Sequence, residues 1–155
     1  MSGKIIAGGI VVLSIIAGIA IYYLQVYHYY EEVDASGEQV MLTLLYGAPE
    51  PILAEGIEAI DATSSPIRYR ACFTTPMSQA MLTETYEPYP QAEPLNAPHW
   101  FDCFDSQEIG LALEQGEALA FLGERNFAHG VDRVVAIFGD GRGYVWHQVN
   151  EEMKK

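Results

Sequence analysis

The stretch IIAGGIVVLSIIAGIAIYYL occupies residues 5–24 and contains no charged side chain. Twenty residues in an α-helix rise by about 30 Å, which is the thickness of the hydrocarbon core of a bilayer. The chain that follows is polar enough to fold in water. The sequence therefore predicts one membrane-spanning helix that holds one water-exposed domain at a membrane surface.

The charges that flank this stretch predict its orientation. Lys4 is the only charged side chain before it, whereas acidic residues follow it from Glu31 onward and no Lys or Arg occurs until Arg68. Positive charge beside a span is retained in the cytoplasm. We therefore expect the N-terminus to be cytoplasmic and the C-terminal domain to lie on the other side of the membrane, which in a bacterium is the periplasm.

A cleaved signal peptide would also have a basic start and an apolar middle, and Gly18-Ile19-Ala20 has the small-x-small pattern of a cleavage site. The apolar run is longer than the usual core of such a signal. No cysteine lies near this region, which excludes a lipoprotein anchor. We expect a retained anchor over residues 1–30.

Aromatic rings crowd the outer end of the predicted span: Tyr22, Tyr23, Tyr27, His28, Tyr29 and Tyr30. Amphipathic rings prefer the headgroup region, so these residues form an aromatic belt that sets the depth of the helix. Small residues within the span would allow another helix to approach closely. The predicted interface with a membrane partner comprises Gly8, Ser14, Gly18, Tyr22 and Tyr23.

The formal net charge is −13, and all twenty-one acidic residues lie beyond residue 30. Nucleic acid is excluded as a partner, because phosphate binding requires the opposite sign. Acidic residues often serve only solubility. They would also attract a basic partner, such as the electron carrier cytochrome c or a cation-rich face of another subunit.

The chain has two cysteines, Cys72 and Cys103, both in the outer domain. An oxidising compartment favours a disulfide between them, which would stabilise the fold by roughly 3–4 kcal/mol. Two unpaired buried thiols are the alternative. The absence of Cys-x-x-Cys and Cys-x-x-Cys-His excludes thioredoxin-like chemistry and covalent haem.

Beyond the anchor, residues 31–38 are expected to form an acidic juxtamembrane linker, residues 39–150 a periplasmic α+β domain and residues 151–155 a tail. Strands are predicted over 39–46, 67–73, 118–122, 131–138 and 144–149, and a short strand or a turn over 57–60. Two short helices are predicted, one beginning at Thr74-Thr75-Pro76 and one capped by Asp105 or Ser106. We expect one antiparallel sheet with both helices on one face.

Two local patterns add detail to this prediction. The stretch IRYRACF (67–73) alternates, which places Arg68, Arg70 and Cys72 on one face of a strand. The helix after Pro76 would bury Met77, Ala80 and Met81. The glycine-rich stretch 139–143 lies between two strands, so it is a hairpin turn and not a phosphate-binding loop.

Few residues suggest chemistry. Four histidines, His28, His99, His129 and His147, are scattered without metal-binding spacing, and His147 is expected to be packed or solvent-facing. A zinc site built from His99, Cys103 and a carboxylate would require a free thiol. Asp102 and Asp105 resemble paired carboxylates, but Asp105 is better explained as a helix cap. No catalytic residue, metal or cofactor is predicted.

Arg68 and Arg70 have two interpretations. They could form an anion site, but in so acidic a domain we expect both guanidinium groups to pair with carboxylates.

Several segments carry a resemblance to a known family: DATSSPIRYRACFTTP (61–76), TETYEPY (83–89), WFDCFD (100–105), GEALAFLGERNFAHGVDRVVAI (116–137) and GRGYVWHQVN (141–150). They resemble a family of small alphaproteobacterial membrane proteins known only as a domain of unknown function, some of which carry a histidine-kinase label. The chain has no dimerisation helix and no ATP-binding glycine boxes. The resemblance therefore implies a bacterial inner-membrane protein and says nothing about catalysis.

Together these features predict a non-catalytic, single-span accessory subunit of a respiratory complex, either a cytochrome oxidase or an oxidase-containing supercomplex. Its partners would be integral membrane subunits, lipids and, at the acidic domain, cytochrome c. A transient assembly factor is one alternative and predicts an exposed apolar patch. A periplasmic ligand sensor or enzyme is another and predicts a deep pocket that joins His99, Asp102 and an arginine.

Overall fold

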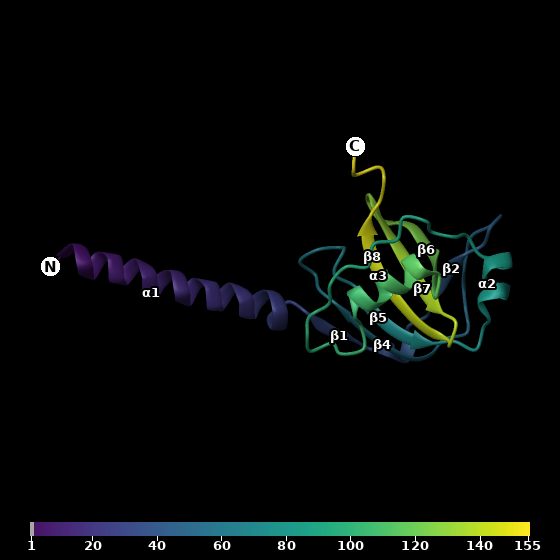
Figure 1. Cartoon of the computed structure of the whole chain (residues 1–155), viewed down its shortest axis with the longest axis horizontal. Helices are drawn as coiled ribbons and strands as arrows, with labels where there is room; N and C mark the ends of the chain where they lie inside the picture. Colours follow the sequence, from purple (N-terminus) through teal and green to yellow (C-terminus); the bar gives the residue numbers. More distant parts are fainter. Residues whose placement is uncertain (1) are drawn as a thin grey trace.

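The computed structural model describes residues 2–155 and shows a long helix that leads into a single domain (Figure 1). Helix α1 (Ser2–Tyr23) continues into a π-helical segment, η1 (Leu24–His28), so the helical stretch spans 27 residues. No residue of α1 is buried, and the helix extends away from the domain. It is long and apolar enough to span a membrane, as a retained anchor or as a signal anchor.

The domain is mixed α+β, as predicted, and is built on a six-stranded antiparallel sheet with the order β1-β4-β5-β8-β7-β6. Its elements are β1 (Glu31–Val33), η2 (Ala35–Gly37), β2 (Met41–Thr43), β3 (Pro49–Pro51), β4 (Glu55–Asp61), β5 (Arg70–Thr74), α2 (Gln79–Thr85), α3 (Ser106–Gln115), β6 (Ala118–Ala128), β7 (Val131–Phe138) and β8 (Arg142–Val149).

The predicted juxtamembrane linker contributes to the sheet. Its first residues form β1, which pairs with β4 in the register Glu31 to Asp61. Asp34 then caps η2 by accepting a hydrogen bond from the backbone of Ser36. The sheet therefore begins close behind the helical stretch, at β1. The residues between β1 and β2 connect β1 to the next strand.

The strand predicted over residues 39–46 is shorter than expected and lies outside the main sheet. β2 pairs with β3 in a separate two-stranded sheet. Glu87 links the two sheets, because its N–H donates to Thr43 O and its carbonyl accepts from Leu122 N, each at 2.9 Å. The outer edge of β6 is thus covered by the chain around Glu87, whereas β1 forms the other edge.

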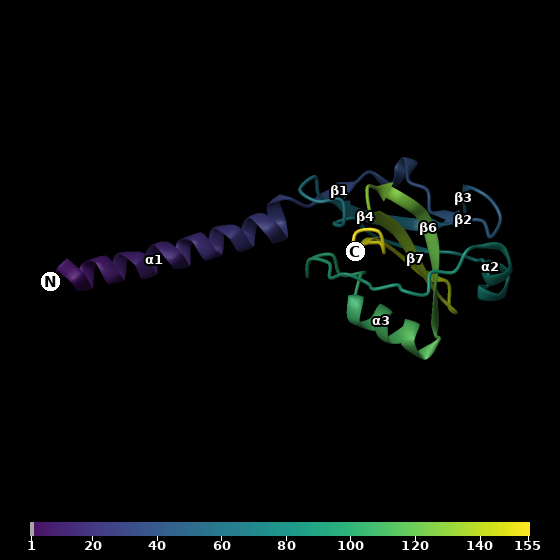
Figure 2. The ribbon, with the colours of Figure 1, turned by 90° about the horizontal axis from the view of Figure 1, so that it is seen from above.

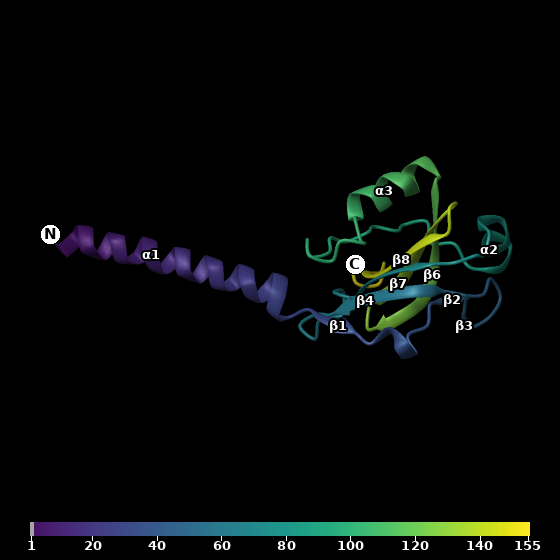
Figure 3. The same cartoon turned by 90° about the horizontal axis from the view of Figure 1, so that it is seen from below.

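Both faces of the sheet are buried, and the alternation of β7 shows how. Val135 and Ile137 belong to a core under β2 and β3, while Val134 and Ala136 belong to a second core under α3. Figures 2 and 3 show α3 on one side of the sheet and β2 and β3 on the other. A strand with two buried faces must be apolar at nearly every position, as VVAIF (134–138) is.

The two helices serve different cores, so the prediction that both cover one face is wrong. Leu82 of α2 packs into the core under β2 and β3, whereas Ile109 and Ala112 of α3 pack into the opposite one. α3 begins as predicted, with Asp105 Oδ1 accepting from the N–H groups of Gln107 and Glu108.

The start of α2 was predicted three residues too early. Thr75 N–H donates to Gly141 O at 2.8 Å, so the chain remains extended there, and Ser78 caps the helix instead. The register shifts with the start: Leu82 is the buried residue of α2, and Met81 is exposed. The β7–β8 turn is the predicted hairpin, with Gly141 at φ 93°, where a side chain would meet Thr75 O.

Candidate functional site

The outer end of the long helix is fastened to the domain by three side chains, Arg68, His99 and Trp100, which we call the helix clamp. Trp100 Nε1 donates to Val26 O at 2.6 Å, and Arg68 Nη1 donates to Gln25 O at 3.3 Å. His99 Nε2 is hydrogen-bonded to the Tyr27 hydroxyl at 2.8 Å. The clamp holds the domain in a defined orientation relative to the helix.

Tyrosines of the predicted aromatic belt take part in this junction. Tyr27 contacts the His99 ring edge-on, with centroids 5.5 Å apart, and Tyr30 contacts Trp100 in the same way at 6.2 Å. Tyr22 and Tyr23 remain exposed on the helix. The belt therefore divides into a part that packs on the domain and a part that is exposed on the helix, and the two parts meet where the Tyr23 ring stacks on Tyr27 at 5.7 Å.

Arg70 holds the proline-rich loop of residues 87–98 against β5. It is 3% exposed, and its guanidinium group donates to the carbonyls of Ile67, Tyr69, Leu95 and Asn96 at 2.7–3.1 Å. Burial lowers the pKa of Arg70 to about 10. The prediction that Arg68 and Arg70 pair with carboxylates is wrong: within residues 2–155 both bind backbone carbonyls and form no ion pair.

The predicted disulfide is confirmed. Cys72 of β5 is bonded to Cys103, with the Cα atoms 6.3 Å apart. Cys72 lies two residues after Arg70 on the same face of the strand, so β5 holds the segment 95–103 at two points. Because the sulfur of Cys103 is bonded, it cannot serve in the zinc site considered above, and no group of three metal-binding side chains occurs in the described chain.

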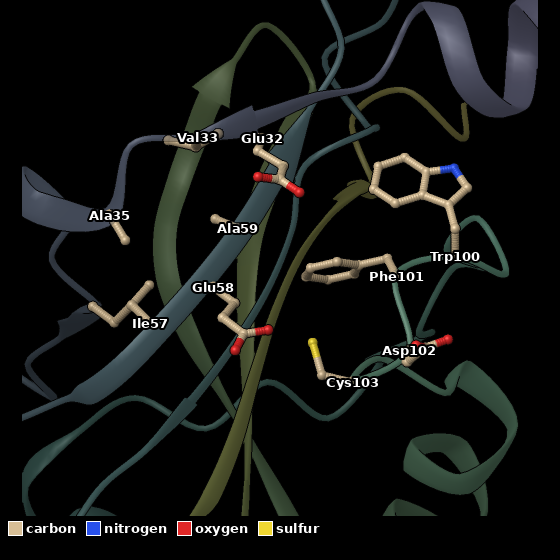
Figure 4. A pocket seen from close by; sticks show the side chains of 10 residues that line it. All are labelled: Glu32, Val33, Ala35, Ile57, Glu58, Ala59, Trp100, Phe101, Asp102 and Cys103. Atoms are coloured by element: carbon tan, nitrogen blue, oxygen red, sulfur yellow. The ribbon is translucent and has the colours of Figure 1, made fainter.

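A pocket of about 390 Å³ lies next to the disulfide (Figure 4). One wall comes from β1 and β4, and the other from the loop that carries Trp100, Phe101 and Cys103. The carboxylates of Glu32 and Glu58 extend from the strand wall toward the Phe101 ring. The pocket is acidic and aromatic, and its lining includes no histidine, lysine or arginine.

The pocket expected for a sensor or enzyme is only partly assembled. His99 and Asp102 line a neighbouring hollow of about 300 Å³, on the side of α3 where Asp105 caps the helix. No arginine contributes to its lining. His28 and His129 are exposed and lie in other parts of the chain. His99 and Asp102 therefore share one hollow, but the arginine expected for a sensor or enzyme site is not part of its lining.

A buried cluster around His147 was not predicted as a site. The Arg133 guanidinium lies over the rings of Tyr69 and Phe127, at 4.9 Å and 4.2 Å, and Arg133 Nε donates to His147 Nε2 at 3.0 Å. His147 Nδ1 lies 2.7 Å from Pro66 O. These partners require a neutral ring with its proton on Nδ1, and of the two expected placements, packed or solvent-facing, His147 has the packed one.

Protonation of His147 is expected to destabilise the domain. Burial, together with the positive charge of Arg133, lowers the pKa of His147 to about 4. The unfolded chain binds this proton near pH 6.5, so the stability that the neutral ring provides is complete above pH 6.5 and is lost as the pH falls toward 4. Between pH 7.5 and pH 5 the free energy of unfolding should decrease by about 2 kcal/mol through this residue.

The measurement is urea unfolding of the full chain in mild detergent at both pH values. His147→Gln keeps an acceptor and a donor without a titrating group, so its loss between pH 7.5 and pH 5 should be smaller than that of the wild type. His129→Gln, at an exposed histidine, is the control and should behave as the wild type. Identical pH dependence in all three proteins would contradict the proposed role of the ring.

Asp132 is a second buried polar residue that sequence reasoning missed. Its carboxylate accepts hydrogen bonds from the Tyr89 hydroxyl, the Asn126 backbone and Asn150 Nδ2 at 2.9–3.0 Å. The signal was present, because Asp132 is the one acidic residue in the strand VDRVVAIF, where every residue except Asp132 and Arg133 is apolar. Its partners come from the proline-rich loop, the β6–β7 hairpin and the end of β8, so its role is to hold these segments together.

Most of the negative charge is not neutralised within the molecule. Of the twenty-one acidic side chains, five lie in ion pairs: Glu87, Glu93, Glu108, Asp132 and Asp140. The other sixteen have no cationic partner within 4.0 Å among residues 2–155. The domain therefore presents a strongly acidic surface.

Comparison with known proteins identifies a family. Residues 40–155 match the model of a family described as "Family of unknown function (DUF6446)". The chain belongs to this family. The matched region of DUF6446 begins before β2 and continues through β8 to the last residue. It therefore includes Arg70, both cysteines, His147 and Asp132. No curated protein and no solved structure matches the chain.

Proposed function

We propose that this DUF6446 protein is a single-span accessory subunit of a bacterial inner-membrane respiratory complex, either a cytochrome oxidase or an oxidase-containing supercomplex. Its N-terminus would be cytoplasmic and its domain periplasmic. The observation that carries the proposal is the helix clamp, which joins an uncovered apolar helix to an acidic domain in one orientation. A helix that served only to tether the domain would not need such a connection.

The helix offers a surface for a partner. Its small residues Gly8 and Gly18 have nothing within 4 Å of where a side chain would begin, so a neighbouring backbone can approach closely. The hydroxyl of Ser14 donates to Ile10 O at 2.8 Å, within its own helix. A second helix could therefore pack here without leaving this hydroxyl unbonded.

The domain offers two kinds of contact. Its sixteen unpaired carboxylates would attract a basic protein, and cytochrome c is the basic partner that an oxidase receives in the periplasm. Apolar side chains are also exposed at the end farthest from α1 (Figure 1), including Leu45 and Tyr46 in the β2–β3 turn and Met81 in α2. This apolar group suits contact with another subunit.

The same apolar group favours a second candidate, a transient assembly factor. An assembly factor would use exposed Tyr46 and Met81 to hold an unfinished subunit and then leave. The two functions differ in stoichiometry: an accessory subunit remains in the mature complex in near-equal amount, whereas an assembly factor is recovered in small amounts. One purification therefore distinguishes them.

The test is affinity purification of the tagged protein from native membranes in mild detergent, with co-purifying subunits identified and quantified. We expect near-equal recovery with oxidase or other respiratory subunits. Gly18→Leu should reduce this recovery at least five-fold, because a leucine fills the space needed by the partner helix. Gly9→Leu is the matched control, since nine residues at 100° place it on the opposite side of the helix.

Two results would contradict the proposal. Recovery of the protein alone would exclude a stable complex, and recovery well below one copy per complex would favour the assembly factor. Equal effects of Gly18→Leu and Gly9→Leu would show that the small-residue face is not the contact.

A further inference from the structure

A second pocket lies at the junction between the long helix and the domain. It has a volume of about 460 Å³, and its lining includes Val26 and Tyr30 from the helix end, Arg68 and Arg70, and Asn96 and Pro98 from the proline-rich loop. The walls therefore come from three separate segments that the helix clamp and Arg70 hold together. Together these segments form an open hollow at the junction, with both arginines in its lining.

The charge of this pocket is opposite to that of the rest of the domain. Arg68 and Arg70 contribute to its lining, and no acidic residue does. Neither arginine forms an ion pair among residues 2–155, although the domain carries twenty-one carboxylates. Asp61 acts on Arg70 only from outside the lining. Arg68 and Arg70 therefore carry positive charge into the pocket without a carboxylate in contact with either of them.

The donors suit a phosphate group. A guanidinium group has five N–H donors in a planar fork, which matches phosphate oxygens in a bidentate way. Arg68 uses one donor for Gln25 O, and its guanidinium lies over the Tyr30 ring at 5.5 Å. The remaining donors of Arg68 are free to bind an anion, while buried Arg70 adds positive charge behind it.

The position of the pocket selects a lipid as the source of the phosphate. The charge-free stretch ends at Leu24, and Val26 and Tyr30 lie just beyond it, within the aromatic belt that occupies the headgroup region. Basic pockets at this depth bind anionic headgroups. We propose that the pocket around Arg68 and Arg70 binds the phosphate of an anionic phospholipid, which neutralises the two guanidinium groups at the membrane surface.

This inference rests on one part of the proposed function, that α1 spans the membrane. It does not depend on a respiratory partner. The experiment is therefore performed on the full chain alone, purified in mild detergent, so that failure to bind lipid and failure to recover other subunits are separate results.

The test is native mass spectrometry during titration with phosphatidylglycerol. We expect one lipid to bind tightly to each wild-type chain. Arg68→Gln should weaken this binding at least ten-fold, and Arg68→Lys, which keeps the charge but not the planar fork, should have a smaller effect. Arg142→Gln is the matched control, because Arg142 lies in the β7–β8 hairpin with its own carboxylate partners. It should bind lipid within two-fold of the wild type.

A second arm distinguishes the source of the phosphate. Inorganic phosphate at millimolar concentration should not displace the lipid from the wild-type chain. Displacement that depends on Arg68 would show a site for free phosphate and overturn the assignment to a lipid. Equal lipid binding by the wild type and Arg68→Gln would overturn the site itself, and equal loss in the Gln and Lys variants would contradict a site based on charge.

Discussion

Replacement of Cys72 and Cys103 by alanine is expected to lower the free energy of unfolding by about 3–4 kcal/mol. The disulfide closes a sequence separation of 31 residues, and its removal returns that loop-closure entropy to the unfolded chain. The decrease corresponds to a fall in melting temperature of roughly 10–20 °C for a domain of this size. The loop with Phe101 and Phe104, both buried, should loosen first.

The measurement is urea unfolding of the full chain in mild detergent, followed by tryptophan fluorescence. Trp100 lies on the loop and Trp146 lies in the core, so the signal reports both regions. Reduction of the wild type with dithiothreitol is the control, and it should reproduce the loss in the alanine variant while leaving that variant unchanged. Unfolding of the reduced wild type at the same urea concentration as the oxidised protein would contradict the prediction.

Arg70→Met is expected to cost about 3–5 kcal/mol. Methionine keeps a long side chain at this position but lacks the N–H groups that donate to four carbonyl oxygens. A buried acceptor without a partner costs about 1–3 kcal/mol. The total is smaller than the sum of four such losses, because the chain at Leu95 and Asn96 can turn its carbonyls toward water. The same unfolding measurement provides the value.

Arg142→Met is the matched control for Arg70→Met. Arg142 pairs with Glu108 and Asp140 at 2.8–2.9 Å, but all three side chains are exposed, and exposed ion pairs contribute less than about 1 kcal/mol. A stability loss for Arg70→Met no greater than that for Arg142→Met would show that the buried guanidinium does not hold the loop.

The features that the sequence predicted correctly are those with a local signal. The long apolar helix follows from a run without charge, most of β5 from alternation in IRYRACF, the start of α3 from Asp105 and the final hairpin from glycines 139–143, although β5 begins at Arg70 and not at Ile67. In each of these cases, neighbouring residues determine the result. The disulfide was predictable for another reason, since the chain has only two cysteines and both follow the helix.

The features that were missed depend on residues distant in sequence. The acidic start of the expected linker became β1 because the edge of β4 offered unpaired backbone groups to it. Arg70 was expected to bind a carboxylate, but the proline-rich loop brought the carbonyls of Leu95 and Asn96 to it. The pair Arg133 and His147 depends on the register between β7 and β8, which no single-strand pattern reveals.

The pocket around Arg68 and Arg70 shows the same contrast between a local sequence signal and contacts that depend on distant residues. The sequence pattern places Arg68 and Arg70 on one face of a strand, and the acidic composition favours ion pairs over an anion site. The sequence does not reveal that both arginines lack a carboxylate partner. Sixteen carboxylates that could have paired with them remain unpaired elsewhere on the folded domain. Composition alone favours ion pairing, whereas backbone geometry determines which charges meet.

The short edge strand β1 affects how copies of this protein can coexist. A helix anchored in a bilayer confines its domain to two dimensions, where neighbouring domains collide far more often than in solution. An open sheet edge in that setting invites strand addition between copies and irreversible clustering. β1 is only three residues long and carries Glu31 and Glu32, so two such edges repel each other, while the opposite edge at β6 is already covered. We therefore expect this sheet to resist strand addition between copies at the high surface density that a membrane anchor would impose.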